Sequence, residues 1–350
     1  MKGTCVKRWR PRQKIVLGLA LVIAVLWYLS EFLDSSDIIS TIGPTPIRRV
    51  GIDPKHLGWM DNTTRYNYNF RIITEPRIRS CPQKLYAVVT SAPRNIERRR
   101  AIRQTWARDI LSREDSRLIF TLGKSNDPDL VKDLRFEQDT DNDVVVFDFD
   151  DTYDNATLKT VLSVKYAAKC NPAYFLKADD DTYVNVERLL TSIQLIEETL
   201  REPFFAGKVR RGAKPHRSYS KWAVDRTEYP EHSYPPYISG NLYIISGSLL
   251  PSAVATALYT RHIHLEDVFM TGLVATKLMA PRVSLEGVWD LRRSTTFNCA
   301  YEQFVSGHYV EASLMREIHD ERRTLVQSCT SLFSVSWCSC VPKITEIFVI

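Results

Sequence analysis

Short apolar runs alternate with amphipathic segments along the chain from about residue 81. Apolar runs of this kind predict strands, and apolar residues three and four positions apart predict helices. The expected strands are 84–90, 118–122, 144–149 and 174–178, and the expected helices are 96–108, 128–137, 158–169 and 186–200, the last with Asn185 as N-cap. Strands and helices in alternation predict an α/β fold with a mostly parallel central sheet.

Beyond about residue 203 the alternation loosens into Gly, Pro, Tyr and basic residues. Residues 242–246 read as a strand, and residues 265–278 as a helix that begins with Glu266 and Asp267. Acidic side chains suit a helix N-terminus because the helix dipole favours negative charge there. We expect this loop-rich half to form the walls of a substrate cleft.

The amino-terminal pattern predicts a membrane anchor. Residues 15–29 are an uninterrupted apolar run with a basic flank before it, which places that flank in the cytoplasm. A cleaved signal peptide is the alternative, but no convincing cleavage site follows the run. We expect a cytoplasmic tail at 1–14, a transmembrane signal anchor at 15–33, a luminal stem with little fixed structure at 34–80, and a luminal catalytic domain at 81–350.

Composition permits a full globular core, with 350 residues of which 44% are hydrophobic. The net charge of +6 is small and comes partly from the amino terminus, so no nucleic-acid partner is expected. Phosphate-bearing small molecules stay open as ligands.

Six of the seven cysteines follow the anchor, in a space where disulfides form. Their spacing leaves the pairing open, and a zinc site is discounted because only Cys338 and Cys340 are close together. Asn62 and Asn155 stand in N-glycosylation sequons that would face the same lumen.

Asp179, Asp180 and Asp181 come directly after an apolar strand. Three adjacent carboxylates repel one another, so they make most sense as oxygen ligands of a hard divalent cation, with a solvated acidic turn as the alternative. An EF-hand is excluded because Tyr183 and Val184 stand where an oxygen ligand and a glycine are required. In parallel sheets, ligands bind beyond the carboxyl ends of the strands, where these acids fall.

A metal site at this strand end, a second acid pair at Glu266 and Asp267, and a luminal location together suggest sugar transfer from a nucleotide-sugar. The metal would bridge the diphosphate and stabilise its charge as it leaves. The second acid pair would supply a general base for the acceptor hydroxyl. A phosphate hydrolase could use the same parts.

Six motifs in a fixed order carry a family resemblance: Ser-Ala-Pro at 91–93, an Arg-rich block at 99–106, an acidic block at 148–160, the Lys-to-Val block at 177–184, Tyr-Pro-Pro-Tyr at 234–240, and Glu-Asp-Val at 266–268. Their order resembles the β-1,3-galactosyltransferase and β-1,3-N-acetylglucosaminyltransferase family, glycosyltransferase family 31, over roughly residues 81–319. The resemblance implies a GT-A fold, Mn²⁺, and inverting β-1,3 transfer of a hexose from a UDP-sugar donor to a glycan acceptor on protein or lipid. It also implies a single-pass type II protein of the Golgi membrane.

Several site residues follow from the resemblance alone. Asp179 and Asp181 match the family's DxD motif, Asp181 as a direct metal ligand and Asp179 nearer the ribose, with Asp180 beside the donor. Asp267 matches the proposed base, and Glu266 next to it is expected to contact the acceptor. His308 stands in a Gly-His-Tyr-Val segment that resembles the family's late His segment, so it is a candidate metal ligand, although a lone His is usually structural.

Other residues are placed near the substrates with an open alternative. Arg103 could approach the diphosphate or uracil. Trp222 and Tyr237 could stack on a sugar face, with packing as the equal alternative. Cys81 and Cys170 look like a disulfide pair of the family.

The sequence departs from the family on the acceptor side. Ile238 stands where a cysteine is common, and the Glu-Asp-Val helix lacks the matching cysteine, which suggests one absent disulfide. Acceptor identity therefore stays open. A catalytically silent glycan-binding protein that keeps the fold is the alternative function, although such a protein would have no need of intact acidic motifs.

Overall fold

The computed structural model describes residues 65–77, 80–218, 220–289, 304–328 and 344–348. The expected cytoplasmic tail, the transmembrane segment at 15–33 and the sequon at Asn62 lie outside these residues. Among the residues that are described, no helix is long and apolar enough to cross a membrane.

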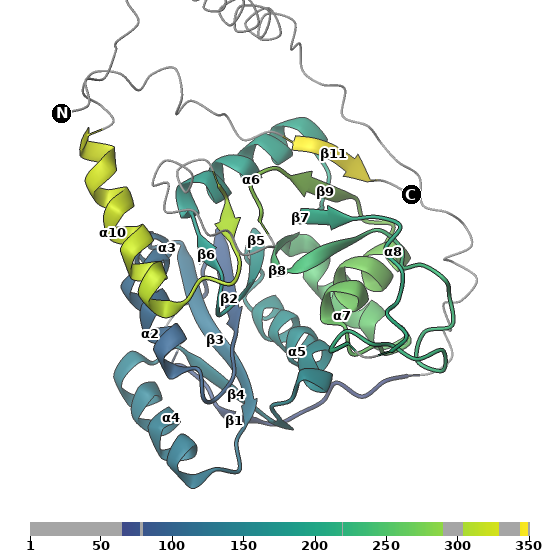
Figure 1. Cartoon of the computed structure of the whole chain (residues 1–350), viewed down its shortest axis with the longest axis horizontal. Helices are drawn as coiled ribbons and strands as arrows, with labels where there is room; N and C mark the ends of the chain where they lie inside the picture. The colour runs from purple at the N-terminus through teal and green to yellow at the C-terminus, as the bar shows by residue number, and fades with distance from the viewer. Residues whose placement is uncertain (1–64, 78–79, 219, 290–303, 329–343, 349–350) are drawn as a thin grey trace, which may run out of the picture. The chain divides into compact units, whose positions relative to one another are not determined.

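A nine-stranded mixed sheet organises the described residues (Figure 1). In spatial order the strands are β1 Ile72–Thr74, β4 Val144–Asp150, β3 Ser116–Lys124, β2 Leu85–Thr90, β5 Tyr174–Asp179, β8 Tyr237–Ser246, β7 Phe205–Arg210, β9 Arg282–Leu285 and β11 Ile344–Phe348. The pairings make β4, β3, β2, β5, β7 and β9 run in one direction and β1, β8 and β11 in the other. The expected α/β architecture with a mostly parallel sheet is confirmed.

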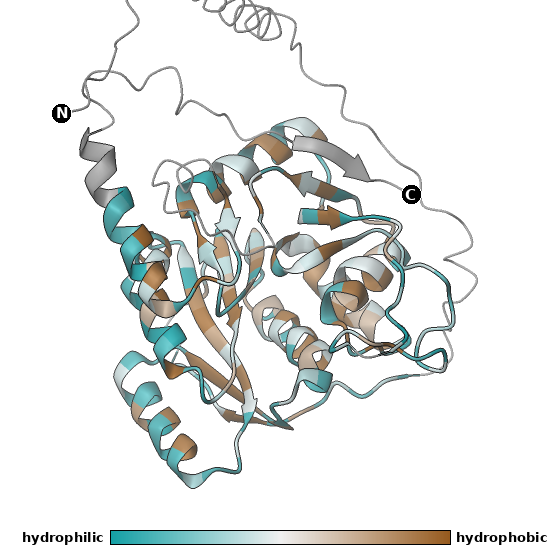
Figure 2. Ribbon diagram, viewed as in Figure 1, coloured by the Kyte–Doolittle hydropathy of each residue, from teal (hydrophilic) through white to brown (hydrophobic). Residues whose placement is uncertain are grey.

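Helices cover both faces of this sheet and bury two separate apolar clusters. The helices on the first face are α2 Ile96–Gln104, α3 Trp106–Leu111, α4 Pro128–Asp141, α6 Val186–Leu200 and α10 Ala312–Ser328. The second face carries α5 Ala156–Ala168, α7 Leu250–Ala257, the π-helix η4 Val268–Val274 and its continuation α8 Ala275–Lys277. Figure 2 shows apolar residues along the strands between these two helical layers.

The period of two along β5 decides what each of its side chains contacts. Tyr174, Leu176 and Ala178 join the cluster on the first face, and Phe175 joins the cluster on the second. Lys177 falls on the second face with Phe175 and is only 2% exposed. A buried ammonium at the end of this strand must find negative or carbonyl partners.

The expected elements before residue 203 are all present, with boundaries shifted by a few residues. Asn185 caps α6 as expected, because its side-chain oxygen accepts the N–H of Arg188 at 3.2 Å. The expected helix at 96–108 is instead two helices, α2 and α3, broken at Thr105, whose backbone is not helical and whose hydroxyl donates to Ala101 O.

The expectation of little fixed structure throughout the stem is wrong for residues 65–77. β1 pairs antiparallel with β4, and Tyr68 is buried with its hydroxyl hydrogen-bonded to His262. Tyr66, Phe70 and Ile72 pack on the same cluster as Tyr68. The described fold therefore includes residues 65–77, of which Ile72–Thr74 form the edge strand.

Cys81 and Cys170 form a disulfide, as the resemblance implied. The bond ties the segment before β2 to the turn between α5 and β5, and therefore anchors the two neighbouring strands whose carboxyl ends carry the site. The remaining cysteines of the catalytic part, Cys299, Cys329, Cys338 and Cys340, lie outside the described residues.

Candidate active site

The acidic turn lies at the carboxyl edge of the sheet, at the end of β5. Its neighbour β2 runs parallel, so Thr90 stands beside Asp179 and its hydroxyl donates to Asp179 Oδ1 at 3.1 Å. On the other side β8 runs antiparallel, which brings its first residues, rather than its last, to the same edge. Gly240 and Asn241 of β8 therefore lie next to the acidic turn.

A second, two-stranded sheet brings His308 to this turn. β6 Tyr183–Val184 pairs antiparallel with β10 Ser306–Gly307, and the N–H of Val310 donates to Asp181 O at 2.9 Å. His308 lies between these two contacts, so its place opposite the acidic turn is fixed by backbone hydrogen bonds on both sides. Its Nε2 atom is 3.2 Å from Asp181 Oδ1 and 4.0 Å from Asp179 Oδ2.

Asp179, Asp181 and His308 can face one metal ion, because one ligand atom from each lies within 4.8 Å of the others. Two carboxylates and one imidazole suit Mn²⁺ and similar divalent cations, which accept oxygen ligands and tolerate nitrogen. Three protein ligands leave coordination positions for oxygens of a substrate. These three ligands therefore fit the metal that the resemblance implied, and they are the residues that were predicted to bind it.

The charge on Asp181 is stabilised by its surroundings. Burial by itself would raise the pKa of Asp181, but the imidazole of His308 and the guanidinium of Arg98 outweigh burial and hold that pKa below its ordinary value. Arg98 NH1 lies 3.8 Å from Asp181 Oδ2. An ionised carboxylate is the form that binds a cation, so Asp181 is ready to act as a ligand.

Asp180 has a structural role that the sequence did not predict. Its carboxylate accepts from Ser91 Oγ at 2.6 Å, Asn95 Nδ2 at 2.8 Å and Arg98 NH1 at 3.0 Å, and it is buried. These three donors belong to the segment that leads from β2 into α2. Because these donors bond both of its carboxylate oxygens, Asp180 holds that segment against the acidic turn. It also lines the pocket, so its predicted place beside the UDP-sugar stays a prediction.

Lys177 was missed by sequence reasoning, although it sits at the centre of the site. Its buried ammonium donates to Asp179 Oδ1 at 2.5 Å, to Gly240 O at 2.5 Å and to Glu266 Oε1 at 3.0 Å. It thus joins a metal-site carboxylate to the second acid pair. A lysine at an inward position of an apolar strand is the sequence signal that could have found it.

Glu266 is held by several neighbours; it also lines the pocket, so its contact with the acceptor stays a prediction. Its Oε1 atom pairs with Lys177, and its Oε2 atom accepts from Tyr243 OH at 2.9 Å and Thr160 Oγ1 at 3.0 Å. Gly240 packs so closely that an added Cβ would lie 2.6 Å from Glu266 Oε1. Glu266 therefore fixes the start of the helix that carries Asp267.

Asp267 lines the same pocket as the acidic turn and has no cationic side chain hydrogen-bonded to it in the described part of the chain. Its oxygens accept two backbone N–H groups, from Val268 at 2.8 Å and Gly240 at 3.2 Å. Burial, and next the carboxylate of Glu266, raise the pKa of Asp267 to about 7. A carboxylate with a pKa near neutrality is suited to accept a proton at physiological pH.

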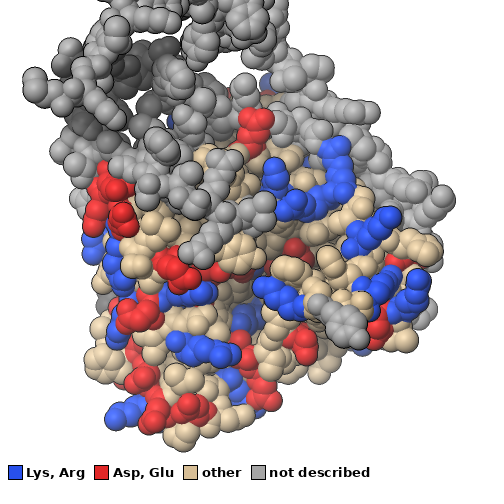
Figure 3. Space-filling view, in the orientation of Figure 1, with Lys and Arg blue, Asp and Glu red and all other residues tan. Residues whose placement is uncertain are grey.

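One pocket of about 760 Å³ contains the metal set, Asp267 and both aromatic residues predicted to contact sugar. Trp222 is 44% exposed, which disfavours the packing alternative for it. Tyr237 is half-buried, and burial and then Asp267 raise its pKa to about 12. Figure 3 shows acidic and basic side chains mixed around the hollow in the middle of this face. Tyr153 and Tyr309 also line the pocket and were not predicted.

Arg103 is not in the pocket, which corrects its predicted contact with the donor. Its guanidinium pairs with Glu137 at 2.7 Å and Asp143 at 2.8 Å, and stacks over the ring of Phe120. The neighbouring Trp106 is fully buried in the core. The Arg-rich block therefore ties α2 to α4 and to the start of β4.

Two other predicted positions have local explanations. Asn155 ends the short helix η2 Tyr153–Asn155, and its Nδ2 atom donates to Asp150 O at 2.8 Å; its glycosylation stays a prediction. Ile238, at the position of the absent cysteine, is fully buried, and its backbone N–H donates to Thr271 Oγ1 at 2.8 Å. A hydrogen bond thus joins β8 to η4. The replacement of the family's cysteine by Ile238 therefore affects the core and not the surface that would contact the acceptor.

Comparison with known proteins gives an independent result. The galactosyltransferase family model matches residues 97–286. Beta-1,3-galactosyltransferase 1 of Homo sapiens is 30% identical over 319 residues, which cover 87% of this chain and 94% of that protein. Beta-1,3-galactosyltransferase 2 of Homo sapiens is 32% identical over 259 residues, 71% of this chain and 61% of that protein. The solved structure of S. aureus TarS 1-349 has a TM-score of 0.34 and 13% identity, covering 73% of this chain and 75% of that one, a likeness too distant to carry an argument.

Proposed function

Because the chain belongs to the galactosyltransferase family and is a β-1,3-glycosyltransferase, we propose that it transfers galactose or an N-acetylhexosamine from a UDP-sugar to a glycan hydroxyl, with inversion at the anomeric carbon. The observation that carries this proposal is the shared pocket, in which the set Asp179, Asp181 and His308 and the separate carboxylate of Asp267 line one cavity.

The acidic turn would hold the donor. A bound Mn²⁺ would supply charge stabilisation for the diphosphate as the bond to the sugar breaks. Asp179, Asp181 and His308 would hold that cation, and Arg98 beside Asp181 keeps the carboxylate ionised. Asp180 contributes by fixing the segment from β2 to α2, which lines the same pocket.

Asp267 would act on the acceptor. It would take the proton of the acceptor hydroxyl as that oxygen attacks the anomeric carbon, on the side opposite to the departing UDP. Two backbone N–H groups orient the carboxylate of Asp267. The carboxylate of Glu266, which Lys177 holds in place, raises the proton affinity of Asp267. Trp222 and Tyr237 would receive the sugar rings of the acceptor.

Fold subtype and location are part of the same proposal. We assign the mixed sheet to the GT-A class, and the chain to the Golgi membrane as a single-pass type II protein anchored by residues 15–33. The Cys81–Cys170 disulfide supports an oxidising compartment for the catalytic part.

Product analysis tests the reaction. Full-length protein purified in detergent is incubated separately with UDP-galactose, UDP-N-acetylglucosamine and UDP-N-acetylgalactosamine, with Mn²⁺ and a panel of glycan acceptors. We expect UDP release and a β-1,3-linked product with one donor. Removing the metal with a chelator, or replacing Asp181 with alanine, should weaken UDP binding by tenfold or more, because the diphosphate then loses its bridging cation.

Asp139→Ala provides the matched control, since Asp139 is an exposed carboxylate on α4 away from the pocket. It should leave UDP binding and its metal dependence unchanged. The proposal is wrong if none of the three UDP-sugars releases UDP with any acceptor. It is also wrong if neither the chelator nor the Asp181 substitution changes the affinity for UDP.

The transfer rate should depend on pH through Asp267. Because its pKa is raised to about 7, the proton-accepting form is a minority at pH 6 and dominates at pH 8. The rate at saturating donor should therefore rise roughly tenfold from pH 6 to pH 8. Initial rates across this range test it, with UDP affinity measured at each pH as the control. A flat profile above pH 5 would show that the carboxylate keeps an ordinary pKa in the complex.

A further inference from the structure

The loop between β7 and β8 brings two lysines to the pocket that contains the acidic turn. Lys214 and Lys221 line the pocket, and both are exposed. Within the described residues neither has a carboxylate at ion-pair distance. Arg210, at the end of β7, lines the same wall, with its Nε atom bonded to Ser239 Oγ at 3.0 Å. Figure 3 shows Lys and Arg side chains gathered over this loop, on the right half of the face.

Lys221 also organises two exposed aromatic rings. Its ammonium lies 4.8 Å from the ring centroid of Trp222 and 6.0 Å from that of Tyr153, and the two rings are 44% and 46% exposed. Exposed aromatic faces at a pocket mouth suit the apolar face of a sugar ring. An ammonium between them places a positive charge beside any sugar that stacks there.

Three carboxylates of the loop and the pocket already have partners. In the loop, Asp225 accepts from Thr227 and from the N–H of Glu228, and Glu228 pairs with His264 at 2.8 Å. Elsewhere in the pocket Asp151 pairs with Lys159 at 2.8 Å. These three acids therefore do not neutralise Lys214 and Lys221.

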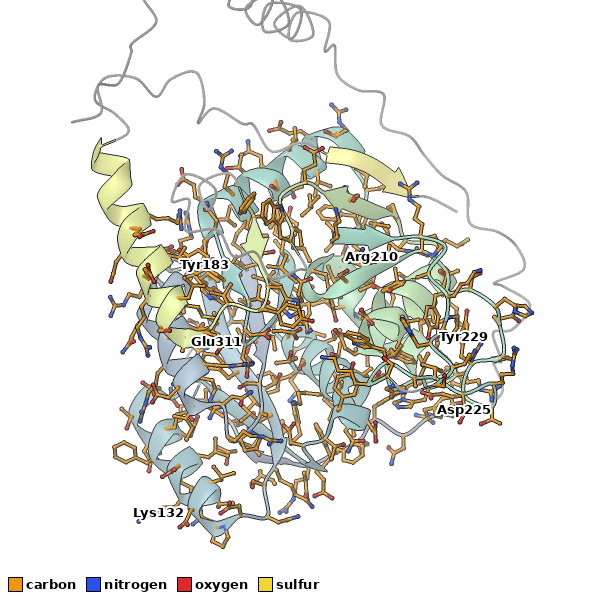
Figure 4. The ribbon with its side chains drawn as sticks, in the orientation of Figure 1. Lys132, Tyr183, Arg210, Asp225, Tyr229 and Glu311 are labelled. Atoms are coloured by element: carbon orange, nitrogen blue, oxygen red, sulfur yellow. A yellow bond between two sulfur atoms is a disulfide. The ribbon has the colours of Figure 1, made fainter. Side chains whose placement is uncertain are left out.

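The loop is held in shape by its own contacts. The guanidinium of Arg217 donates to four backbone oxygens, those of Val224, Asp225, Tyr229 and Glu231. The N–H of Val224 donates in turn to His216 O at 2.8 Å. Figure 4 shows Tyr229 and Asp225 in the loop beyond β7, whose end carries Arg210. The lysines and Trp222 thus stand on a braced segment.

We infer that this rim, defined as Lys214, Lys221, Trp222 and Tyr153, recognises an acceptor saccharide that carries a negative charge, as a carboxylate or a sulfate. This inference rests on the proposed function for the identity of the pocket. The aromatic rings take the sugar face, and the two ammonium groups pair with the anion. A neutral acceptor would use the rings but would offer no anion of its own to the two lysines.

Three probes that differ only at carbon 6 test the inference: p-nitrophenyl β-glucoside, its 6-sulfate, and p-nitrophenyl β-glucuronide. Their binding to the full chain is measured with Mn²⁺ and UDP present. The two anionic probes should bind roughly three- to tenfold more tightly than the neutral one, as expected for two partly exposed ion pairs. The advantage should shrink at high salt. An advantage of one anionic probe alone identifies the preferred anion.

The Lys214→Gln/Lys221→Gln double variant should bind all three probes alike, and Lys132→Gln, an exposed lysine on α4, should keep the wild-type preference. Equal binding of the three probes by the wild type would overturn the inference. The inference would also be wrong if the double variant still bound the anionic probes more tightly than the neutral one. It would be wrong too if the double variant kept this preference and lost affinity for UDP. UDP release from the donor is measured on the same preparation. Its absence would contradict the proposed function, while the probe series still reports on the rim.

Discussion

Replacing Asp267 with asparagine should lower kcat by about 10²- to 10⁴-fold and leave the affinity for UDP almost unchanged, the effect typical of losing a general base. Asparagine has the same shape but cannot accept the proton of an acceptor hydroxyl. The donor is held elsewhere, at Asp179, Asp181 and His308, so its binding should not follow the loss of rate. Steady-state kinetics together with direct UDP titration measure the two effects separately.

The local structure should tolerate this change. Asp267 accepts the N–H groups of Val268 and Gly240, and an asparagine oxygen can still accept one of them. Thermal unfolding of the variant checks that any loss of stability is small, and Asp139→Asn on α4 controls for removing a carboxylate. A rate within about threefold of the wild type, or an equal loss of UDP affinity, would remove Asp267 from the role of base.

Replacing Lys177 with methionine should lower the free energy of unfolding by about 3–5 kcal/mol, the range for breaking a buried ion pair. Methionine keeps the length and the apolar stem, so packing beside the ring of Tyr243 changes little. The loss comes from charge: Asp179 and Glu266 keep their carboxylates but lose the ammonium between them, and Gly240 O loses a donor. Urea denaturation measures the change in stability.

A double-mutant cycle identifies the partner responsible. Adding Glu266→Gln to Lys177→Met removes one of the two uncompensated carboxylates, so it should restore part of the lost stability. Lys132→Met, on the exposed side of α4, should change stability by less than about 0.5 kcal/mol. If Lys177→Met is as mild as this control, the ammonium does not hold the site together.

Local patterns predicted the elements that position the site. The apolar run of β5 and the acids directly after it gave both the strand and the place of the ligands, because the carboxyl ends of parallel strands meet at one edge. The cap at Asn185 follows from its side chain alone. The place of Asp267 at the start of a helix was also predicted from local sequence, because acidic residues are favoured at a helix N-terminus.

Other features depended on contacts between distant segments. Arg103 lies one helical turn after Arg99, so the two side chains point the same way. Their contact with Glu137 of α4 depends on how the two helices pack, which the local sequence does not determine. The three acids were read as one set, but the turn after β5 places Asp180 against Ser91, Asn95 and Arg98, which are far from it in the sequence. Lys177 was passed over because its partners, above all Glu266, are far away in the sequence.

The small sheet of β6 and β10 makes the metal-binding set depend on a segment that comes late in the chain. His308 reaches Asp181 through β10, and α10 secures that segment: His319 bonds the hydroxyl of Tyr183 at 3.3 Å, and Arg316 bonds Gln104 of α2. The family match at residues 97–286 contains both aspartates but ends before His308. During synthesis the chain therefore presents its two aspartates well before His308 can join them, so binding of a metal by all three ligands would report that β10 has paired with β6.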